Sequence, residues 1–207
     1  MFFMIYELQD LEQAILNYNG TMSVLFPLIK DKFMEEIMTN SKSGLHDGEE
    51  NFMHEFCCFE DEYYSIKKDI ILNHLTTIPV IDIGCQFGLQ SEIFLDMEYT
   101  GIEAMEKVFL NNSCDNINYI SDIFPNKEMD LSGKIAMAIM SLGYFDYAED
   151  LETIQELSKA EIVYCTSTPE FIAKLKNKFK FCKLLNSTNV KKTRISSGVW
   201  KFSNHEI

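Results

Sequence analysis

The residues whose types and spacing could do chemistry lie between positions 80 and 103. There a short apolar stretch, Val-Ile-Asp-Ile, runs into a turn with Gly84 and Gly88, and Glu103 stands 21 positions after Asp82. Glycine permits the positive φ angles and the close ligand approach needed where a buried strand reverses into a helix. A carboxylate at this spacing, at the end of the next strand, can accept hydrogen bonds from both hydroxyls of a ribose. The pattern predicts recognition of a nucleoside.

The spacing within the turn separates one kind of nucleotide from another. A nicotinamide dinucleotide site needs G-x-G-x-x-G, whereas Gly-Cys-Gln-Phe-Gly at 84–88 has no third glycine at that spacing. The sequence also has no phosphate loop of the G-x-x-x-x-G-K-[ST] kind. A dinucleotide is therefore the poorer fit, and a structural strand-to-helix turn without any ligand stays open as the simpler alternative.

The rest of the chain predicts elements that would bring polar residues to one edge of a sheet. An apolar run such as 134–140 is typical of a central parallel strand that is buried on both faces. Apolar residues at helical spacing indicate an amphipathic helix, and a proline suits the first turn of the next one. The predicted strands cover 118–123, 134–140 and 161–166, the helices 147–160 and 169–178, and a closing hairpin joins 181–185 to 195–202.

The glycine turn followed by Glu103 resembles motif I of the class I S-adenosylmethionine-dependent methyltransferases. One departure is Gln86, which stands where this family usually has a central glycine. The resemblance extends over about residues 76–204 and implies a doubly wound, mostly parallel seven-stranded sheet with an antiparallel last strand. It implies S-adenosylmethionine as cofactor, held by Asp82, Gly84, Cys85, Gly88, Glu103, Ala104, Asp122, Ile123 and Ser141.

Two of these positions bear on adenine and on the methyl acceptor. The resemblance implies that Asp122 accepts the adenine amino group, but an ordinary Asx turn competes as an explanation of this residue. It also places Ser141, Tyr144 and Asp146 where the family has substrate-facing residues. Because a sulfonium is already an activated methyl donor, positioning can supply most of the catalysis, so no obligate catalytic residue is named. If a base is used, Tyr144 or Asp146 is the nearest candidate, and no Asp/Asn-Pro-Pro-Tyr/Phe signature supports action on DNA bases.

The first 75 residues predict a helical extension that precedes a Rossmann-like methyltransferase domain at 76–207. Apolar residues recur at helical spacing in 6–17 and 22–38, and 49–75 reads as one or two further helices. The aromatic and sulfur-rich run 52–59, with Tyr63-Tyr64, is a candidate wall of a lid over the cofactor site. Plain core packing is the simpler explanation of this run, and the helices could also form a dimer interface.

Charge is distributed unevenly along the chain. The net charge is −14, with −9 in residues 1–75, −13 in 76–170 and +8 in 171–207. The acidic balance opposes nonspecific binding to nucleic acid, whose affinity comes largely from neutralised phosphates. The basic end could meet an acidic partner locally, although solvated lysines that pair with the chain's own acidic surface are the simpler explanation.

Other features limit the location and the chemistry. No apolar run approaches the roughly 20 residues that cross a bilayer, and the apolar start is followed directly by acidic residues and lacks the basic region of a signal peptide. The six cysteines form no Cys-x-x-Cys pair and the four histidines are dispersed, so reduced thiols in a cytoplasmic protein without a metal site are expected.

Three functional interpretations follow. The first is a methyltransferase that acts on a small molecule or a protein side chain. The second is a catalytically inactive methyltransferase-fold protein that works as an interaction or inhibitor protein through its acidic surface. The third is an enzyme that consumes S-adenosylmethionine by another route, such as cleavage.

Overall fold

The computed structural model of the chain describes residues 8–17, 60–86, 88–104, 114–126, 129–143, 147–186 and 198–206. Within these ranges the helices are α1 (Leu8–Leu16), α4 (Glu60–Leu72), α5 (Tyr147–Leu157) and α6 (Pro169–Lys176), together with the 3-10 helix η2 (Leu89–Phe94). The strands are β1 (Val80–Ile83), β2 (Tyr99–Glu103), β3 (Ile117–Ser121), β4 (Ile135–Ile139), β5 (Ile162–Thr166), β6 (Phe181–Asn186) and β7 (Val199–Ser203).

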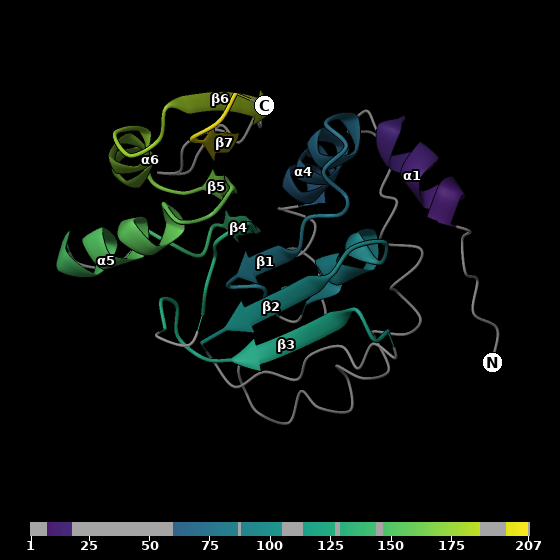
Figure 1. The fold of residues 1–207 in the computed structure, drawn as a ribbon, viewed down its shortest axis with the longest axis horizontal. Coiled ribbons are helices and arrows are strands. Elements are labelled where there is room, and N and C mark those ends of the chain that lie inside the picture. Colours follow the sequence, from purple (N-terminus) through teal and green to yellow (C-terminus); the bar gives the residue numbers. More distant parts are fainter. Residues whose placement is uncertain are drawn as a thin grey trace, which may run out of the picture.

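The strands form one seven-stranded sheet in the order β3-β2-β1-β4-β5-β7-β6 (Figure 1). The strands β1 to β5 are parallel, and β7 inserts antiparallel between β5 and β6. The order reverses between β1 and β4, and open α/β sheets place their ligands at such a switch point, at the carboxyl ends of the strands. The predicted doubly wound sheet with an antiparallel last strand is confirmed.

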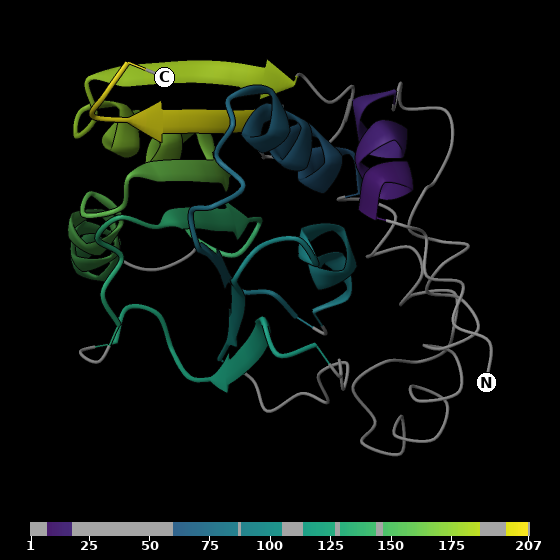
Figure 2. The same ribbon diagram turned by 45° about the vertical axis from the view of Figure 1, so that its right-hand side comes forward.

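Alternating side chains of the sheet form two apolar layers. On one face α4 and η2 cover residues that include Val80, Tyr99 and Met137. On the other face α5 and α6 cover residues that include Ile83, Ala138 and Phe202, and Figures 1 and 2 show these helices on opposite sides of the sheet. All five residues of β4 are buried, as expected of a central parallel strand.

A buried lysine and a partly buried aspartate fasten α4 to the sheet. Asp69 of α4 accepts hydrogen bonds from Lys201 Nζ of β7 at 2.6 Å and from the Tyr164 hydroxyl of β5 at 2.7 Å. Lys201 is only 5% exposed, so its charge depends on this partner. We call Asp69, Tyr164 and Lys201 the α4 anchor.

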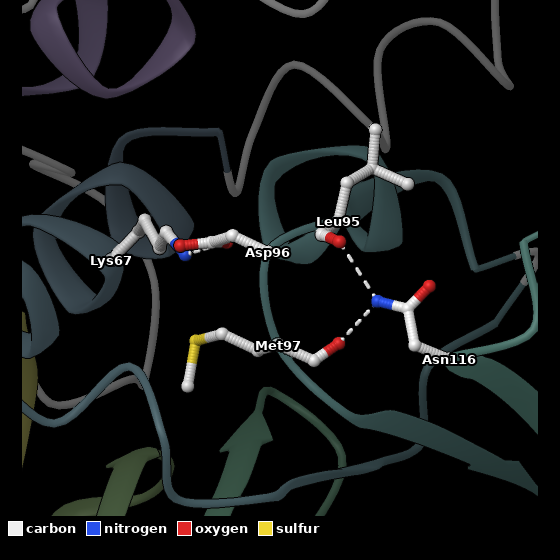
Figure 3. Close-up of polar contacts among 5 residues, drawn as sticks. All are labelled: Lys67, Leu95, Asp96, Met97 and Asn116. Carbon is white, nitrogen blue, oxygen red and sulfur yellow. Dashed lines mark hydrogen bonds and ion pairs between the residues drawn. The ribbon is translucent and has the colours of Figure 1, made fainter. Parts of the chain in front are cut away.

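The turn between η2 and β2 is held from two sides (Figure 3). Lys67 of α4 forms an ion pair with Asp96. Asn116, just before β3, donates through Nδ2 to the carbonyl oxygens of Leu95 at 2.8 Å and Met97 at 2.6 Å. These contacts place η2 against α4 and fix the start of β2.

The structure agrees with most predicted elements. The helix expected after the glycine turn is η2, a 3-10 helix of six residues. At α6, Thr168 caps the helix by accepting from Phe171 N at 3.3 Å, and Pro169 follows it in the first turn, as predicted. The predicted segments 22–38, 52–59 and 195–197 lie outside the described residues, and so do Tyr144 and Asp146.

Candidate functional site

The Asp82 side chain supports the turn from the interior of the protein and does not face solvent. It is fully buried near the carboxyl end of β1, and its Oδ2 accepts from Gln90 Nε2 at 2.5 Å and from the Tyr99 hydroxyl at 2.7 Å. Within the described part of the chain, its Oδ1 has no hydrogen-bond partner. Burial raises the pKa of Asp82 to about 6, against the lowering effect of the two hydrogen bonds.

Residues 84–88 form what we call the glycine loop, and three side chains hold the backbone of its described residues. Gln90 Nε2 donates to the Cys85 carbonyl oxygen at 3.0 Å. Glu103 Oε2, at the end of β2, accepts from Gln86 N at 3.0 Å. The Tyr119 hydroxyl of β3 hydrogen-bonds to the Gly88 carbonyl oxygen at 3.1 Å and lies 2.8 Å from Ser91 Oγ. The loop geometry is therefore fixed by its own neighbours.

Packing requires glycine at both ends of the loop. At Gly84, which has a φ of 74°, an added Cβ would lie 2.2 Å from Ser141 Cβ. At Gly88, with a φ of 75°, it would lie 2.3 Å from the Tyr119 ring. Ser141 Oγ also donates to the Ile83 carbonyl oxygen at 2.5 Å, which joins the ends of β1 and β4. Both glycines thus serve the close contact of loop and sheet.

The central position of the loop is different. Gln86 has a φ of 51° without being glycine, and it is exposed. In nucleotide-binding turns the central glycine is the one that lets a ligand approach the backbone. Here a side chain stands at that position, although the backbone keeps the left-handed conformation that favours glycine.

The remaining predicted cofactor contacts lie along the same edge of the sheet. Asp122 N donates to the Glu103 carbonyl oxygen at 3.1 Å, so the ends of β2 and β3 are adjacent. The Asp122 carboxylate accepts from Ile123 N at 2.7 Å and from Asn126 Nδ2 at 2.9 Å, so local contacts hold its side chain. Ile123 is 64% exposed and Ala104 is exposed, whereas the Cys85 thiol is buried.

The structure thus brings most of the predicted cofactor-binding residues together at the glycine loop. Further residues that were not predicted support the loop. Asp82, Cys85 and Glu103 meet at the glycine loop, and Ser141 closes it from β4. Sequence reasoning missed Gln90, Tyr99 and Tyr119. One signal could have identified Tyr99. It lies two residues before Gly101, which pairs with Asp82. Because residues two apart along a strand share a face, the polar group of Tyr99 lies on the same face as Asp82.

The described residues offer no metal site. No group of three or more histidine, cysteine, aspartate or glutamate side chains among them is arranged to hold a metal ion. Likewise, no helix in the described ranges is long and apolar enough to cross a membrane.

Solved structures with a similar fold include methyltransferases. Magnesium protoporphyrin IX methyltransferase (ChlM) from Synechocystis PCC 6803, solved with bound SAM, matches over 89% of this chain and 98% of its own, with a TM-score of 0.56 and 12% identity. The N-methyltransferase NodS from Bradyrhizobium japonicum WM9 matches over 72% of this chain and 97% of its own, with a TM-score of 0.53 and 15% identity. The chain has the class I methyltransferase fold.

Other comparisons set the limits of this likeness. The bifunctional kinase-methyltransferase WbdD matches with 15% identity and a TM-score of 0.52 over 70% of this chain, which spans only 35% of that protein. In two further WbdD structures the chain spans 39% of the protein. No protein-family model matches the sequence, and no curated protein matches it.

Proposed function

We propose that the protein is an S-adenosylmethionine-dependent methyltransferase that acts on a small molecule or a protein side chain. The observation that supports this most is the 3.0 Å hydrogen bond between Gln86 N and Glu103 Oε2. It joins the glycine loop to the carboxylate that ends β2, at the ligand-binding edge of a methyltransferase fold. The two parts of the pattern that suggested a nucleoside site in the sequence are therefore in contact, which supports the proposal.

The residues at this edge fit the proposed cofactor. Glu103 would accept from the ribose hydroxyls, and the backbone beside Gly84 and Ser141 would border the methionine portion. Asp122 and the exposed Ile123 would border the adenine ring. When bound, the sulfonium supplies an activated methyl group. The chain's own residues would then mainly hold donor and acceptor in line and exclude water.

The charge of the chain favours one kind of acceptor. With a net charge of −14, a cationic or neutral acceptor would meet a more favourable field than a polyanion. The helical extension would lie near the site as a lid or as a dimer interface. The four described cysteines are all free thiols, which is consistent with our proposal of a cytoplasmic location.

Calorimetric titration with S-adenosylmethionine and S-adenosylhomocysteine tests this proposal. Glu103→Gln keeps an oxygen that can accept from Gln86 N but loses the charge, and we expect it to weaken binding at least roughly tenfold, about 1.4 kcal/mol. The matched control is Glu98→Gln, an exposed carboxylate just before β2 at the opposite end of the strand. Gly88 is a poor test position because its substitution would displace Tyr119.

Each outcome of the titration decides something. Micromolar binding that Glu103→Gln weakens and Glu98→Gln does not would support the site and justify an acceptor screen with a labelled methyl donor. Equal affinity in both variants would mean that the pocket is wrongly placed. If the cofactor binds, product analysis would separate methyl transfer from cofactor cleavage.

A second candidate is favoured by Gln86. Because a side chain occupies the position where a ligand must approach the backbone, the fold could serve as a catalytically inactive interaction or inhibitor protein with an acidic surface. Absence of binding of either cofactor form to the folded protein would favour this candidate and overturn the first.

A further inference from the structure

We propose that the free edge of β6, together with the lysines beside it, is a docking surface for an acidic polypeptide segment that adds to the sheet as a further strand. We call this surface the β6 edge and define it as residues 178–186. The inference does not depend on methyl transfer, because the β6 edge lies at the opposite end of the sheet from β2 and β3.

The β6 edge is open in the part of the chain that the structure describes. Figure 2 shows β6 along the outer border of the sheet, and β7 is its only strand neighbour among the described residues. Such a strand presents unpaired backbone N–H and C=O groups along its outer side, which can pair with an incoming strand.

The exposed side chains of β6 alternate in a way that suits strand addition. Phe181 is 43% exposed and Leu184 is 38% exposed, although both are large and apolar. Pairing of Lys183 with Lys201 and of Leu184 with Trp200 places consecutive β6 residues on opposite faces. An added strand would therefore meet Phe181 and Lys183 on one face and Leu184 on the other.

The surroundings of the β6 edge are strongly basic. Residues 171–186 contain five lysines and no acidic residue. Lys174 is paired with Asp150, and Lys176 lies over the Trp200 ring with Nζ 3.4 Å from its centroid. Lys178, Lys180 and Lys183 are exposed, and none of them forms an ion pair within the described ranges. Among the described residues of the basic end, Lys174 and Lys201 thus pair with the chain's own acidic residues, whereas Lys178, Lys180 and Lys183 do not.

The lysines of the β6 edge favour one kind of binding partner over the others. Antiparallel pairing of the β6 edge with that of a second copy would bring two segments together that each carry Lys178, Lys180 and Lys183, and like charges on paired strands are destabilising. A nucleic acid would meet the basic edge but also the repulsion of a chain with net charge −14, and it offers no side chains for Phe181 and Leu184. An extended segment that alternates acidic and β-branched residues satisfies the backbone, the lysines and the apolar side chains together.

The test uses the full chain and a fluorescent synthetic peptide of alternating glutamate and valine. We expect micromolar binding by fluorescence anisotropy at low salt, which weakens as salt rises. Lys183→Glu should weaken binding at least fivefold, whereas Lys159→Glu, an equal charge change on a 50% exposed lysine after α5, should change it less than twofold. Thermal melts would check that both variants are folded.

Two further probes separate strand addition from general attraction. The same peptide with N-methyl groups on alternate residues keeps its charge but loses half of its backbone donors, and we expect it to bind at least fivefold more weakly. Equal binding of the methylated peptide would overturn the proposal, as would equal binding of a single-stranded oligothymidylate of the same charge. Concentration-dependent self-association that Lys183→Glu alters would assign the edge to a second copy instead.

Discussion

A partly buried aspartate, Asp69, and a fully buried one, Asp82, hold different parts of the molecule in different ways. Asp69 accepts from the cation of Lys201 and from Tyr164, so its charge is matched by an opposite charge. Asp82 accepts only from the neutral donors Gln90 and Tyr99, and one of its oxygens has no hydrogen-bond partner among the described residues. The α4 anchor is therefore a paired structural contact, whereas the support of the glycine loop keeps an uncompensated charge.

This difference agrees with where each aspartate lies. The α4 anchor joins a helix to the distant strands β5 and β7, far from the carboxyl ends of β1 and β2. Asp82 lies directly under the loop that we propose as the cofactor site. Buried ionisable groups with raised pKa values gather at functional sites more often than elsewhere, which fits an Asp82 pKa of about 6.

The largest effect is expected from breaking the α4 anchor. Asp69→Ala would leave Lys201 buried without its counter-charge, which should lower the free energy of unfolding by about 3 kcal/mol. Urea denaturation measures this loss. In the double variant Asp69→Ala, Lys201→Met the orphaned charge is gone, and at least half of the stability should return; no recovery would show that the anchor stabilises by other contacts.

An intermediate effect is expected at the end of the glycine loop. Gly88→Ala puts a Cβ where the Tyr119 ring lies and places alanine at a φ of 75°, so the free energy of unfolding should fall by about 2 kcal/mol. A double-mutant cycle with Tyr119→Ala separates the two causes. Partial relief of the Gly88→Ala cost in the Tyr119→Ala background would confirm the steric part, and strict additivity would argue against it.

The smallest effect on stability is expected at Asp82, and it depends on pH. Because the pKa of Asp82 is about 6 in the folded chain against an ordinary 3.8, the folded state holds the proton more tightly. This contribution to stability is present below about pH 4 and is lost as the pH rises through 6. Asp82→Asn should therefore raise the unfolding free energy by about 1 kcal/mol at neutral pH, with no gain near pH 4. Exposed Glu152→Gln on α5 is the control for net charge; a gain independent of pH would refute an ionised Asp82.

The strands were predictable from the sequence because their signals are local. The apolar runs that became β4 and β5 are continuous, as buried parallel strands require. The meeting of Glu103 with the glycine loop was also predictable, since adjacent parallel strands end at the same edge. These inferences needed only chain order and residue type.

The support of the loop was not predictable in the same way. Gln90 and Tyr119 reach the loop from a 3-10 helix and from the third strand, and neither contact follows from spacing along the chain. The sequence indicated a helix after Gly88 but not its 3-10 type: only ten residues separate Gly88 from Tyr99, and they also include the turn that Asn116 holds through Met97. Tertiary contacts decided this segment, not helix propensity.

The place of β7 has a consequence for synthesis of the chain. It lies between β5 and β6, although it follows both in sequence. As the chain leaves the ribosome, β6 has no sheet neighbour until residues 199–203 have emerged, and Asp69 waits equally long for Lys201. A nascent chain halted before Val199 would expose the edge of β5 to proteases and chaperones, so the sheet is complete only once β7 has been synthesised.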